Sequence, residues 1–200
     1  MNKLILLGLF LPVVTCLAEP VAVFDVHWGR KKLRQTRSFA IALDPIAAPQ
    51  TAANFKKLVQ DGFYRKTIFH RVFPGYLVQG GDPITKHKDR SAMGTGGPGY
   101  TLRSEIRLRH VRGSVAMARM PDNVNLNRQS NGSQFYVCLQ SIPGQDGKDT
   151  VFGHVISGLE ALDEISRMPA DSNANPDERI EVDRTYLIDR SQLGMPRRKR

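Results

Sequence analysis

The segment that most constrains the fold lies at residues 68–83, where two short runs of aromatic and β-branched residues flank Pro74 and Gly75. Two such runs around a Pro-Gly pair are typical of two strands joined by a turn. The second run ends in the turn-forming residues GGDP at positions 80–83. The sequence therefore predicts two adjacent β-strands in this segment.

The first of these strands places an arginine among aromatic rings. With a side-chain period of two, Phe69, Arg71 and Phe73 share one face of the strand, and the residues between them share the other. A guanidinium between two rings, with the amide of Gln79 on the adjoining strand, suits the binding of an uncharged peptide carbonyl beside an apolar ring. The alternative is an arginine on an edge strand, whose aliphatic stem covers apolar neighbours.

The motifs around Arg71, together with later segments in the same order, resemble those of the cyclophilin family of peptidyl-prolyl cis/trans isomerases. The segments are FHRV at 69–72, PGYLVQGGD at 74–82, GTGGPG at 94–99, GSVAMA at 113–118, NGSQFYV at 131–137 and VFG at 151–153. The resemblance covers about residues 21–188. It implies a mainly β fold, a closed antiparallel eight-stranded barrel capped by two α-helices, and it implies neither a cofactor nor a metal.

The resemblance also implies roles for individual residues. Arg71 would donate a hydrogen bond to the prolyl nitrogen, and Gln79 would hold the substrate backbone and orient the guanidinium. The proline ring would lie against Tyr76, Leu77 and Tyr136, with Phe73 as a neighbour. Ala118 and Arg119 match positions that pair with the substrate backbone and with the residue before proline.

The chain departs from the family pattern at several of these positions. Tyr76 and Tyr136 stand where phenylalanine is common, so two hydroxyl groups need hydrogen-bond partners. Arg119 replaces a more common asparagine and adds a charge at the groove. Gly144 and Gln145 stand where many members have an aromatic-Leu pair, which predicts a more open and wetter pocket wall.

The first 18 residues have the three parts of a secretory signal peptide: a short positive start, an apolar run at 4–17 and a small-x-small cleavage site ending at Ala18. Cleavage there would leave an isomerase domain at 19–190 and a basic tail at 191–200, in the periplasm or outside the cell. A lipoprotein signal with Cys16 as the lipidated residue is the alternative, and Thr15 before it fits that poorly. Cys138 would then be the one thiol of the mature chain, and it is expected to be buried.

Length and charge fit a single domain with basic extensions. The 200 residues carry a formal net charge of +10, and much of it lies at 30–37 and 197–200. Such clusters can bind nucleic acid, anionic membranes or acidic proteins. Neither stacking aromatics nor a helix-borne basic motif accompanies them, so solvated charge is the favoured interpretation and no nucleic-acid partner is expected.

The remaining pattern predicts short strands and two helices. The helices are expected at 49–62, with Thr51 as N-cap and Gly62 as the stop, and at 158–168. The basic cluster at 30–37 is expected to form an exposed hairpin loop. The polar, Asn-rich residues 120–130 are expected to form a surface insertion beside the substrate groove.

Together these observations predict a monomeric prolyl isomerase without a membrane span. Its substrates would be unfolded or extended polypeptides that contain proline, and it would assist the folding of exported proteins. The alternative is a proline-binding chaperone or scaffold in which the altered pocket wall has weakened catalysis.

Overall fold

The computed structural model describes residues 20–29, 31–87 and 90–194 of the chain. The predicted signal peptide, Arg30 and most of the basic tail lie outside these residues. Eight strands form one antiparallel sheet: β1 (Pro20–Trp28), β2 (Gln35–Leu43), β3 (Arg71–Phe73), β4 (Leu77–Gly80), β6 (Ser114–Met117), β8 (Phe135–Cys138), β9 (Val151–Ser157) and β10 (Glu181–Asp189). The other elements are a two-stranded sheet of β5 (Thr101–Leu102) and β7 (Ser130–Asn131), the helices α1 (Pro49–Gln60) and α2 (Leu159–Ser166), and short 3₁₀ turns at η1 (Lys31–Leu33), η2 (Pro83–Lys86), η3 (Pro143–Gln145) and η4 (Arg190–Gln192).

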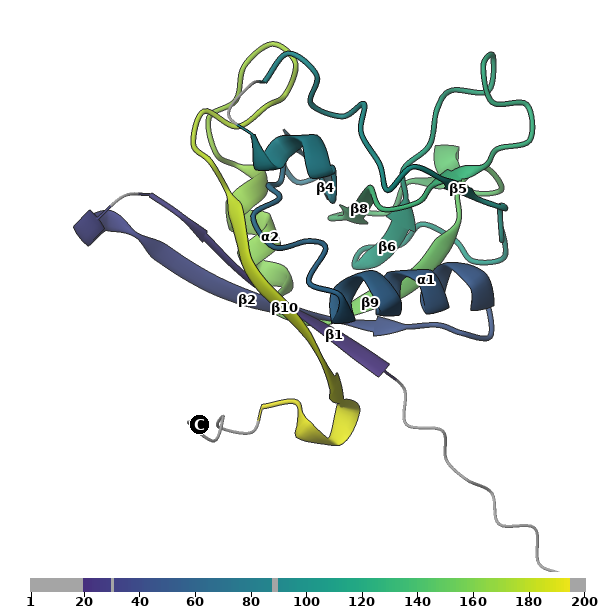
Figure 1. Cartoon of the computed structure of the whole chain (residues 1–200), viewed down its shortest axis with the longest axis horizontal. Coiled ribbons are helices and arrows are strands. Elements are labelled where there is room, and N and C mark those ends of the chain that lie inside the picture. Colours follow the sequence, from purple (N-terminus) through teal and green to yellow (C-terminus); the bar gives the residue numbers. More distant parts are fainter. Residues whose placement is uncertain (1–19, 30, 88–89, 195–200) are drawn as a thin grey trace, which may run out of the picture.

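The large sheet has the strand order β10-β1-β2-β9-β6-β8-β4-β3, and it curls around the main hydrophobic core (Figure 1). The prediction of a mainly β fold with two helices is confirmed. The strand pairing does not show the predicted closed barrel, because β10 and β3 are the two edges of the sheet and do not form a ladder with each other. They approach through an isolated bridge between Ile68 and Glu181 and a hydrogen bond from the Phe69 amide to the Ile180 carbonyl (3.0 Å).

The core contains a group of aromatic rings that come from segments far apart in the sequence. Phe24 stacks on Phe39 at a centroid distance of 5.1 Å, and Phe55 of α1 lies 4.8 Å from Phe152. Stacked and tilted ring pairs of this kind add to the stabilisation that burial of the rings already gives. The helices close the core, with α1 packed against β10, β1 and β9, and α2 against β2, β4 and β3.

The predicted alternation along residues 69–73 holds only in part. Phe69 is 1% exposed and lies in the core, whereas Arg71 is exposed and Phe73 is half-buried. The regular strand begins only at Arg71, and the Phe69 amide bonds to Ile180 instead of continuing the ladder, so the period of two is interrupted between 69 and 71. The guanidinium therefore has one phenylalanine beside it and not two.

The hairpin between β1 and β2 is longer than the loop prediction allowed. The strands pair as far as Trp28 opposite Gln35, so Arg37 belongs to β2 and lies outside the loop. Cys138 is buried, as predicted. None of the helices in the described part of the chain is long and apolar enough to cross a membrane.

The helix α1 confirms the predicted spacing but not the predicted cap. Ala52, Phe55 and Leu58 are buried at helical intervals, and Gly62 follows the helix end with a positive φ of 68°. Thr51 is not the N-cap, because the helix begins earlier, at Pro49. The Glu105 carboxylate instead accepts hydrogen bonds from the amides of Gln50 (3.0 Å) and Thr51 (2.8 Å).

Replacing Glu105 by alanine is expected to lower the free energy of unfolding by about 1 kcal/mol, because two amides of the first helical turn lose their acceptor. Chemical denaturation of both proteins measures the difference. Glu105→Gln keeps one acceptor oxygen without the charge and should fall between them. Equal stability of the alanine variant and the parent would show that water replaces the carboxylate at no cost.

Candidate active site

A cavity of about 680 Å³ lies over the part of the sheet formed by β3, β4, β6 and β8. It brings together six of the eight predicted site residues: Arg71, Leu77, Gln79, Ala118, Arg119 and Tyr136. Phe73 and Tyr76 stand behind this lining, edge to face with each other at 6.3 Å between ring centroids. Tyr76 packs against the apolar cluster that includes Tyr136, so it supports the cavity wall from outside.

The strand register explains why residues far apart in the sequence meet here. Arg71 of β3 lies directly opposite Gln79 of β4, Gln79 lies opposite Tyr136 of β8, and Tyr136 lies opposite Ala116 of β6. Directly opposed residues on antiparallel strands point to the same face with Cβ atoms about 5 Å apart. A guanidinium, an amide and an aromatic ring thus form one row across the sheet.

The Arg71 guanidinium packs on the ring of Phe73 and does not form an ion pair with a described residue. Its guanidinium carbon lies 4.8 Å from the centroid of Phe73, within the range of a cation–π contact. Among the described residues no carboxylate lies within ion-pair distance of it. The guanidinium can therefore donate its hydrogen bonds to a molecule in the cavity.

The amide of Gln79 is oriented by a second glutamine. Its Nε2 donates to Gln134 Oε1 (3.0 Å), and Gln134 Nε2 donates to the carbonyls of Gly94 (2.9 Å) and Gly96 (2.8 Å). Because its nitrogen is engaged, Gln79 offers its oxygen to Arg71 or to a ligand. The glycine-rich run 94–99 thus anchors the amide pair through the carbonyls of Gly94 and Gly96.

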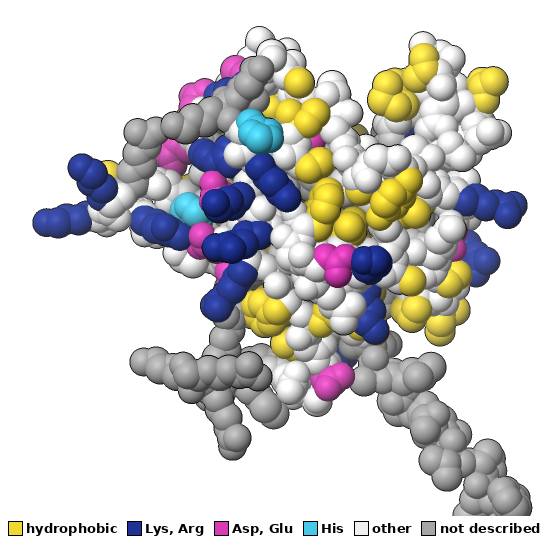
Figure 2. All heavy atoms as spheres, in the orientation of Figure 1, with side chains coloured by type: hydrophobic (Ala, Val, Ile, Leu, Met, Phe, Trp, Pro, Cys, Tyr) yellow, Lys and Arg dark blue, Asp and Glu magenta, His cyan; other side chains and the backbone are white. Residues whose placement is uncertain are grey.

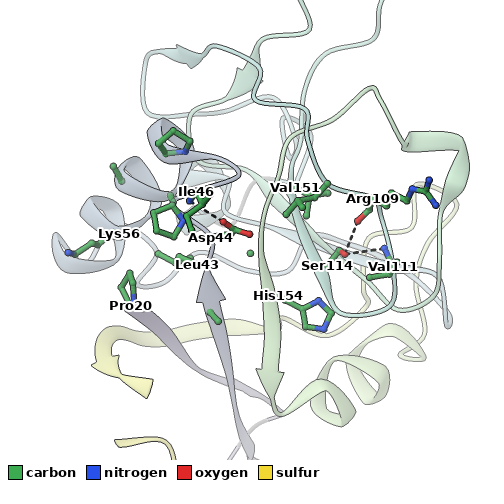
Figure 3. Close-up of a pocket in the computed structure, with 17 residues that line it drawn as sticks. Pro20, Leu43, Asp44, Ile46, Lys56, Arg109, Val111, Ser114, Val151 and His154 are labelled. Atoms are coloured by element: carbon green, nitrogen blue, oxygen red, sulfur yellow. Dashed lines mark hydrogen bonds between the residues drawn. The ribbon is translucent and has the colours of Figure 1, made fainter. Parts of the chain in front are cut away.

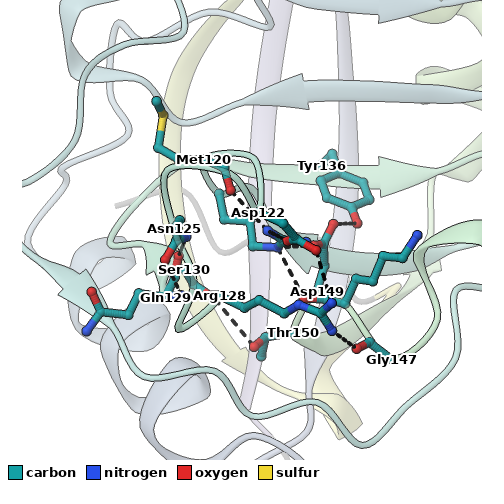
Figure 4. Close-up of polar contacts among 12 residues, drawn as sticks. Met120, Asp122, Asn125, Arg128, Gln129, Ser130, Tyr136, Gly147, Asp149 and Thr150 are labelled. Carbon is teal, nitrogen blue, oxygen red and sulfur yellow. Dashed lines mark hydrogen bonds and ion pairs between the residues drawn. The ribbon is translucent and has the colours of Figure 1, made fainter.

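The hydroxyl of Tyr136 has a buried acceptor. It donates to Asp149 Oδ2 (2.7 Å), while Asp149 Oδ1 accepts from Arg119 Nε at 2.6 Å (Figure 4). The pKa of Tyr136 is raised far above its usual value, first by burial and then by the Asp149 carboxylate. Tyr136 is therefore a neutral donor whose ring is fixed in the wall of the cavity.

Arg119 is less available to a substrate than its sequence position implies. Its side chain is 9% exposed, and besides Asp149 it binds Asp122 through Nη1 (2.5 Å). Burial alone would lower the pKa of Arg119, but the hydrogen bonds to these two carboxylates outweigh it and raise the pKa. The charge that Arg119 adds to the groove is thus neutralised within the chain.

The same ionic network fixes the predicted insertion at 120–130. Arg128 donates to Asp122 Oδ2 (3.0 Å) and to the Gly147 carbonyl (2.8 Å), which ties this loop to the loop that precedes β9 (Figure 4). Met120 and Val124 of the insertion line a smaller cavity of about 310 Å³ that shares Gln79 and other lining residues with the first. The insertion therefore borders the groove, as predicted, and lengthens it.

Beside the groove, the backbone amide and carbonyl of Ala118 are hydrogen-bonded within the chain, whereas those of Arg119 are available to a ligand. The Ala118 amide donates to the Gln134 carbonyl (3.0 Å), and its carbonyl accepts from the Asn131 amide (2.8 Å). In the described part of the chain, the amide and carbonyl of Arg119 have no hydrogen-bond partner. Ala118 thus offers its methyl group to the groove, and Arg119 offers a peptide unit.

Sequence reasoning does not find several residues of this site. Gln134 lies within a recognisable motif, so its position beside Gln79 could have been noticed. Asp149 follows a run of turn residues at 143–147, where a solvated acid is the ordinary expectation. Gln145 lines the cavity as the polar wall that the sequence predicts at this point.

His70 is a further unexpected member of the cavity lining. Burial lowers its pKa to about 4, against the weaker opposite effect of the Asp82 carboxylate. Between pH 6.5 and about 4, His70 is therefore protonated in the unfolded chain, where its pKa is the ordinary 6.5, but largely neutral in the folded chain. The stability present above pH 6.5 should thus be lost progressively on acidification.

His70→Gln should remove this dependence. Relative to the variant, the parent is expected to lose about 1.6 kcal/mol of unfolding free energy between pH 6.5 and pH 5, because the unfolded histidine is half protonated at the start of this range and the full slope of 1.36 kcal/mol per pH unit is reached only below it. Urea denaturation of both proteins across this range measures the two slopes, so a constant offset from the substitution does not matter. Parallel slopes would mean that His70 titrates normally in the folded protein.

A larger cavity of about 760 Å³ contains none of the predicted residues. It lies between the end of β2, the start of α1 and β9, and apolar side chains such as Leu43, Ile46 and Val151 line it (Figure 3). Ser114 Oγ in its wall is engaged with the Val111 amide (3.0 Å). Its lining is largely apolar, whereas the smaller cavity places Arg71, Gln79 and the Tyr136 ring side by side, so the smaller cavity is the better candidate for catalysis.

Comparison with known proteins shows which family the chain resembles. A sequence model of the family described as cyclophilin type peptidyl-prolyl cis-trans isomerase/CLD matches residues 32–187. The chain is 42% identical over 127 residues to peptidyl-prolyl cis-trans isomerase B of Bacillus subtilis (strain 168), covering 62% of this chain and 80% of that protein. It is 40% identical over 125 residues to a peptidyl-prolyl cis-trans isomerase of Helicobacter pylori, covering 60% and 69%.

More distant relatives match over a longer span. Peptidyl-prolyl cis-trans isomerase-like 1 of Aspergillus fumigatus is 33% identical over 170 residues, covering 84% of this chain and 94% of that protein. A crystal structure of a Cryptosporidium parvum cyclophilin type peptidyl-prolyl cis-trans isomerase superposes with a TM-score of 0.67 at 27% identity. It covers 84% of this chain and 98% of that one.

Proposed function

Because the chain belongs to the cyclophilin-type peptidyl-prolyl cis-trans isomerase family, we propose that its polar groove accelerates rotation about X–Pro bonds in exported polypeptides as they fold. The observation that carries this proposal is the row of Arg71, Gln79 and Tyr136 on directly opposed strands, facing one cavity. The chemistry requires neither a nucleophile nor a proton transfer. It requires only a site that binds the twisted amide better than either planar form.

The uncatalysed reaction is slow because amide resonance must be broken. The barrier is about 18–20 kcal/mol, and exchange takes tens to hundreds of seconds. As the bond twists, the prolyl nitrogen becomes pyramidal and its lone pair becomes a hydrogen-bond acceptor. A donor placed at that nitrogen stabilises the transition state selectively, and lowering the barrier by about 7–8 kcal/mol corresponds to a rate increase of about 10⁵–10⁶.

Arg71 is the proposed donor, because its guanidinium faces the cavity and no carboxylate of the described residues pairs with it. Gln79 Oε1 orients the guanidinium and contacts the substrate backbone. The proline ring packs on Leu77 and on the ring of Tyr136, with Phe73 and Tyr76 supporting this wall. The open peptide unit of Arg119 pairs with the backbone of the substrate.

Export is the second part of the proposal, and it rests on the three-part pattern of residues 1–18. In a bacterial host, the protein recovered from the periplasm or medium should begin at Glu19, as measured by mass spectrometry of its N-terminus. Recovery of the chain in the cytoplasm with residues 1–18 intact would contradict the export proposal and would leave the isomerase proposal unaffected.

A protease-coupled assay on a prolyl peptide tests the catalytic part. The full chain should accelerate isomerisation and the slow refolding phase of a protein limited by X–Pro bonds. Background rates from a folded chain that still binds proline peptides would favour the alternative of a proline-binding chaperone. Gln145 in the pocket wall would then be the first residue to replace in a search for the cause of the weakened catalysis.

A further inference from the structure

The β1–β2 hairpin ends in a tip that protrudes from the molecule (Figure 1). We call residues 29 and 31–34 the basic tip. Lys31, Lys32 and Leu33 are all exposed, and Leu33 is 78% exposed. The turn is tightly built: Gly29 has a φ of 76°, and a Cβ there would lie 2.6 Å from the Leu33 carbonyl oxygen. The fold thus directs a leucine and two lysines into solvent.

The basic tip continues into a wider basic face along β10, visible at the left of the molecule (Figure 2). Three arginines of this face are paired with carboxylates: Arg34 with Asp183, Arg179 with Glu181 and Arg184 with Asp25. The Lys66 amide donates to the Val182 carbonyl, which fixes residues 65 and 66 beside β10. Among the described residues of this face, four cations have no carboxylate within ion-pair distance: Lys31, Lys32, Arg65 and Lys66.

We propose that the basic tip docks on an anionic lipid bilayer, with Lys31 and Lys32 at the headgroups and Leu33 in the boundary with the acyl chains. Cations beside an anionic leaflet are attracted at short range, and an apolar side chain is stabilised by leaving water. The wider face, with Arg65 and Lys66, adds attraction without insertion.

The exposed leucine favours a bilayer over a soluble polyanion. A polysaccharide or nucleic acid would attract the lysines equally, but it offers Leu33 no apolar phase. Recognition of single-stranded nucleic acid relies on stacking aromatics. Among the described residues, Tyr100 is the exposed large aromatic, and it lies beside Asn54 of α1 and not at the tip. This docking is independent of the isomerase proposal.

Vesicle co-sedimentation of the full chain tests the docking. The probes are phosphatidylcholine vesicles with and without phosphatidylglycerol, and the readout is the ratio of the two affinities. Residues 1–19 are present in every variant, so their own membrane affinity cancels. Lys31→Gln with Lys32→Gln should lower the affinity for anionic vesicles roughly 25-fold, about fivefold per cation, and leave neutral vesicles unaffected.

Leu33→Ser should weaken binding to the anionic vesicles several-fold without changing its dependence on salt. The matched control is Lys56→Gln with Arg103→Gln, which removes two exposed cations away from this face and should change the ratio little. All variants should keep the isomerase activity of the parent, which verifies that they fold.

Undiminished binding of the double lysine variant would overturn the proposal, as would an equal loss in the matched control. A loss seen only when residues 197–200 are removed would assign the binding to the tail instead. Heparin binding as tight as vesicle binding, with no effect of Leu33→Ser, would identify a soluble polyanion as the ligand and exclude the bilayer.

Discussion

Arg71→Ala is expected to lower kcat/KM for a prolyl peptide by about 10²–10³-fold, the range observed when one preorganised donor to a transition state is removed. The loss should fall on kcat with little change in KM, because the hydrogen bond to the pyramidal nitrogen exists only in the twisted state. A role in ground-state binding alone would instead raise KM and leave kcat in place.

The fold should survive this change. Arg71 is exposed, and among the described residues its guanidinium makes a cation–π contact with Phe73, at 4.8 Å from the ring centroid. Loss of such a contact at an exposed site costs about 0.5–1 kcal/mol. Thermal unfolding monitored by circular dichroism should therefore be nearly unchanged.

Two further variants sharpen the experiment. Arg71→Lys keeps the charge but replaces the planar fork of donors by a point charge on a flexible stem, so it should recover little activity. Arg65→Ala removes another exposed arginine away from the cavity and should be fully active. If Arg71→Ala retained the rate of the parent, the guanidinium mechanism would have to be abandoned.

Local signals in the sequence predict part of the row of site residues. The turn at Pro74 and Gly75 sets the register that places Arg71 opposite Gln79, which follows from turn chemistry and strand alternation. Tyr136 joins them through the pairing of β4 with β8, two segments far apart in the sequence, so its place in the site is implied by the family resemblance and not by a local pattern. The buried spacing of α1 is predictable from a local pattern.

The features that sequence reasoning misses depend on contacts between distant segments. The cap of α1 comes from Glu105, more than 50 positions beyond the helix start, so Thr51 looked like the better candidate. Phe69 leaves the strand pattern because its amide pairs with Ile180 across the gap between the sheet edges. Asp149 resembles a loop acid until β8 places the hydroxyl of Tyr136 next to it.

Asp149→Ala should be the most destabilising change in the groove, lowering the free energy of unfolding by about 3 kcal/mol. Breaking a buried ion pair by removing one partner costs about 3–5 kcal/mol, because the other charge stays buried. The cost should be at the low end, since Arg119 keeps Asp122 and the carbonyls of Met120 and Lys148. Urea denaturation measures this difference.

The same change should lower kcat/KM about tenfold, because the Tyr136 ring loses the acceptor that fixes it against the proline. Tyr136→Phe keeps the ring and the Asp149–Arg119 pair but removes the anchoring hydroxyl, so it should cost about 1 kcal/mol of stability and also lower kcat/KM about tenfold. A double-mutant cycle between Asp149→Ala and Tyr136→Phe then measures the energy of the hydroxyl contact alone.

Replacing both Asp149 and Arg119 by apolar residues tests whether their ion pair stabilises the fold or positions the Tyr136 ring. Asp149→Leu with Arg119→Met leaves no uncompensated charge, and such exchanges are often neutral or stabilising. We expect stability close to that of the parent but activity as low as in Asp149→Ala, because the ring of Tyr136 is again unanchored. Full activity in this double variant would show that apolar packing alone positions the ring, and that the ionic network serves only to neutralise Arg119.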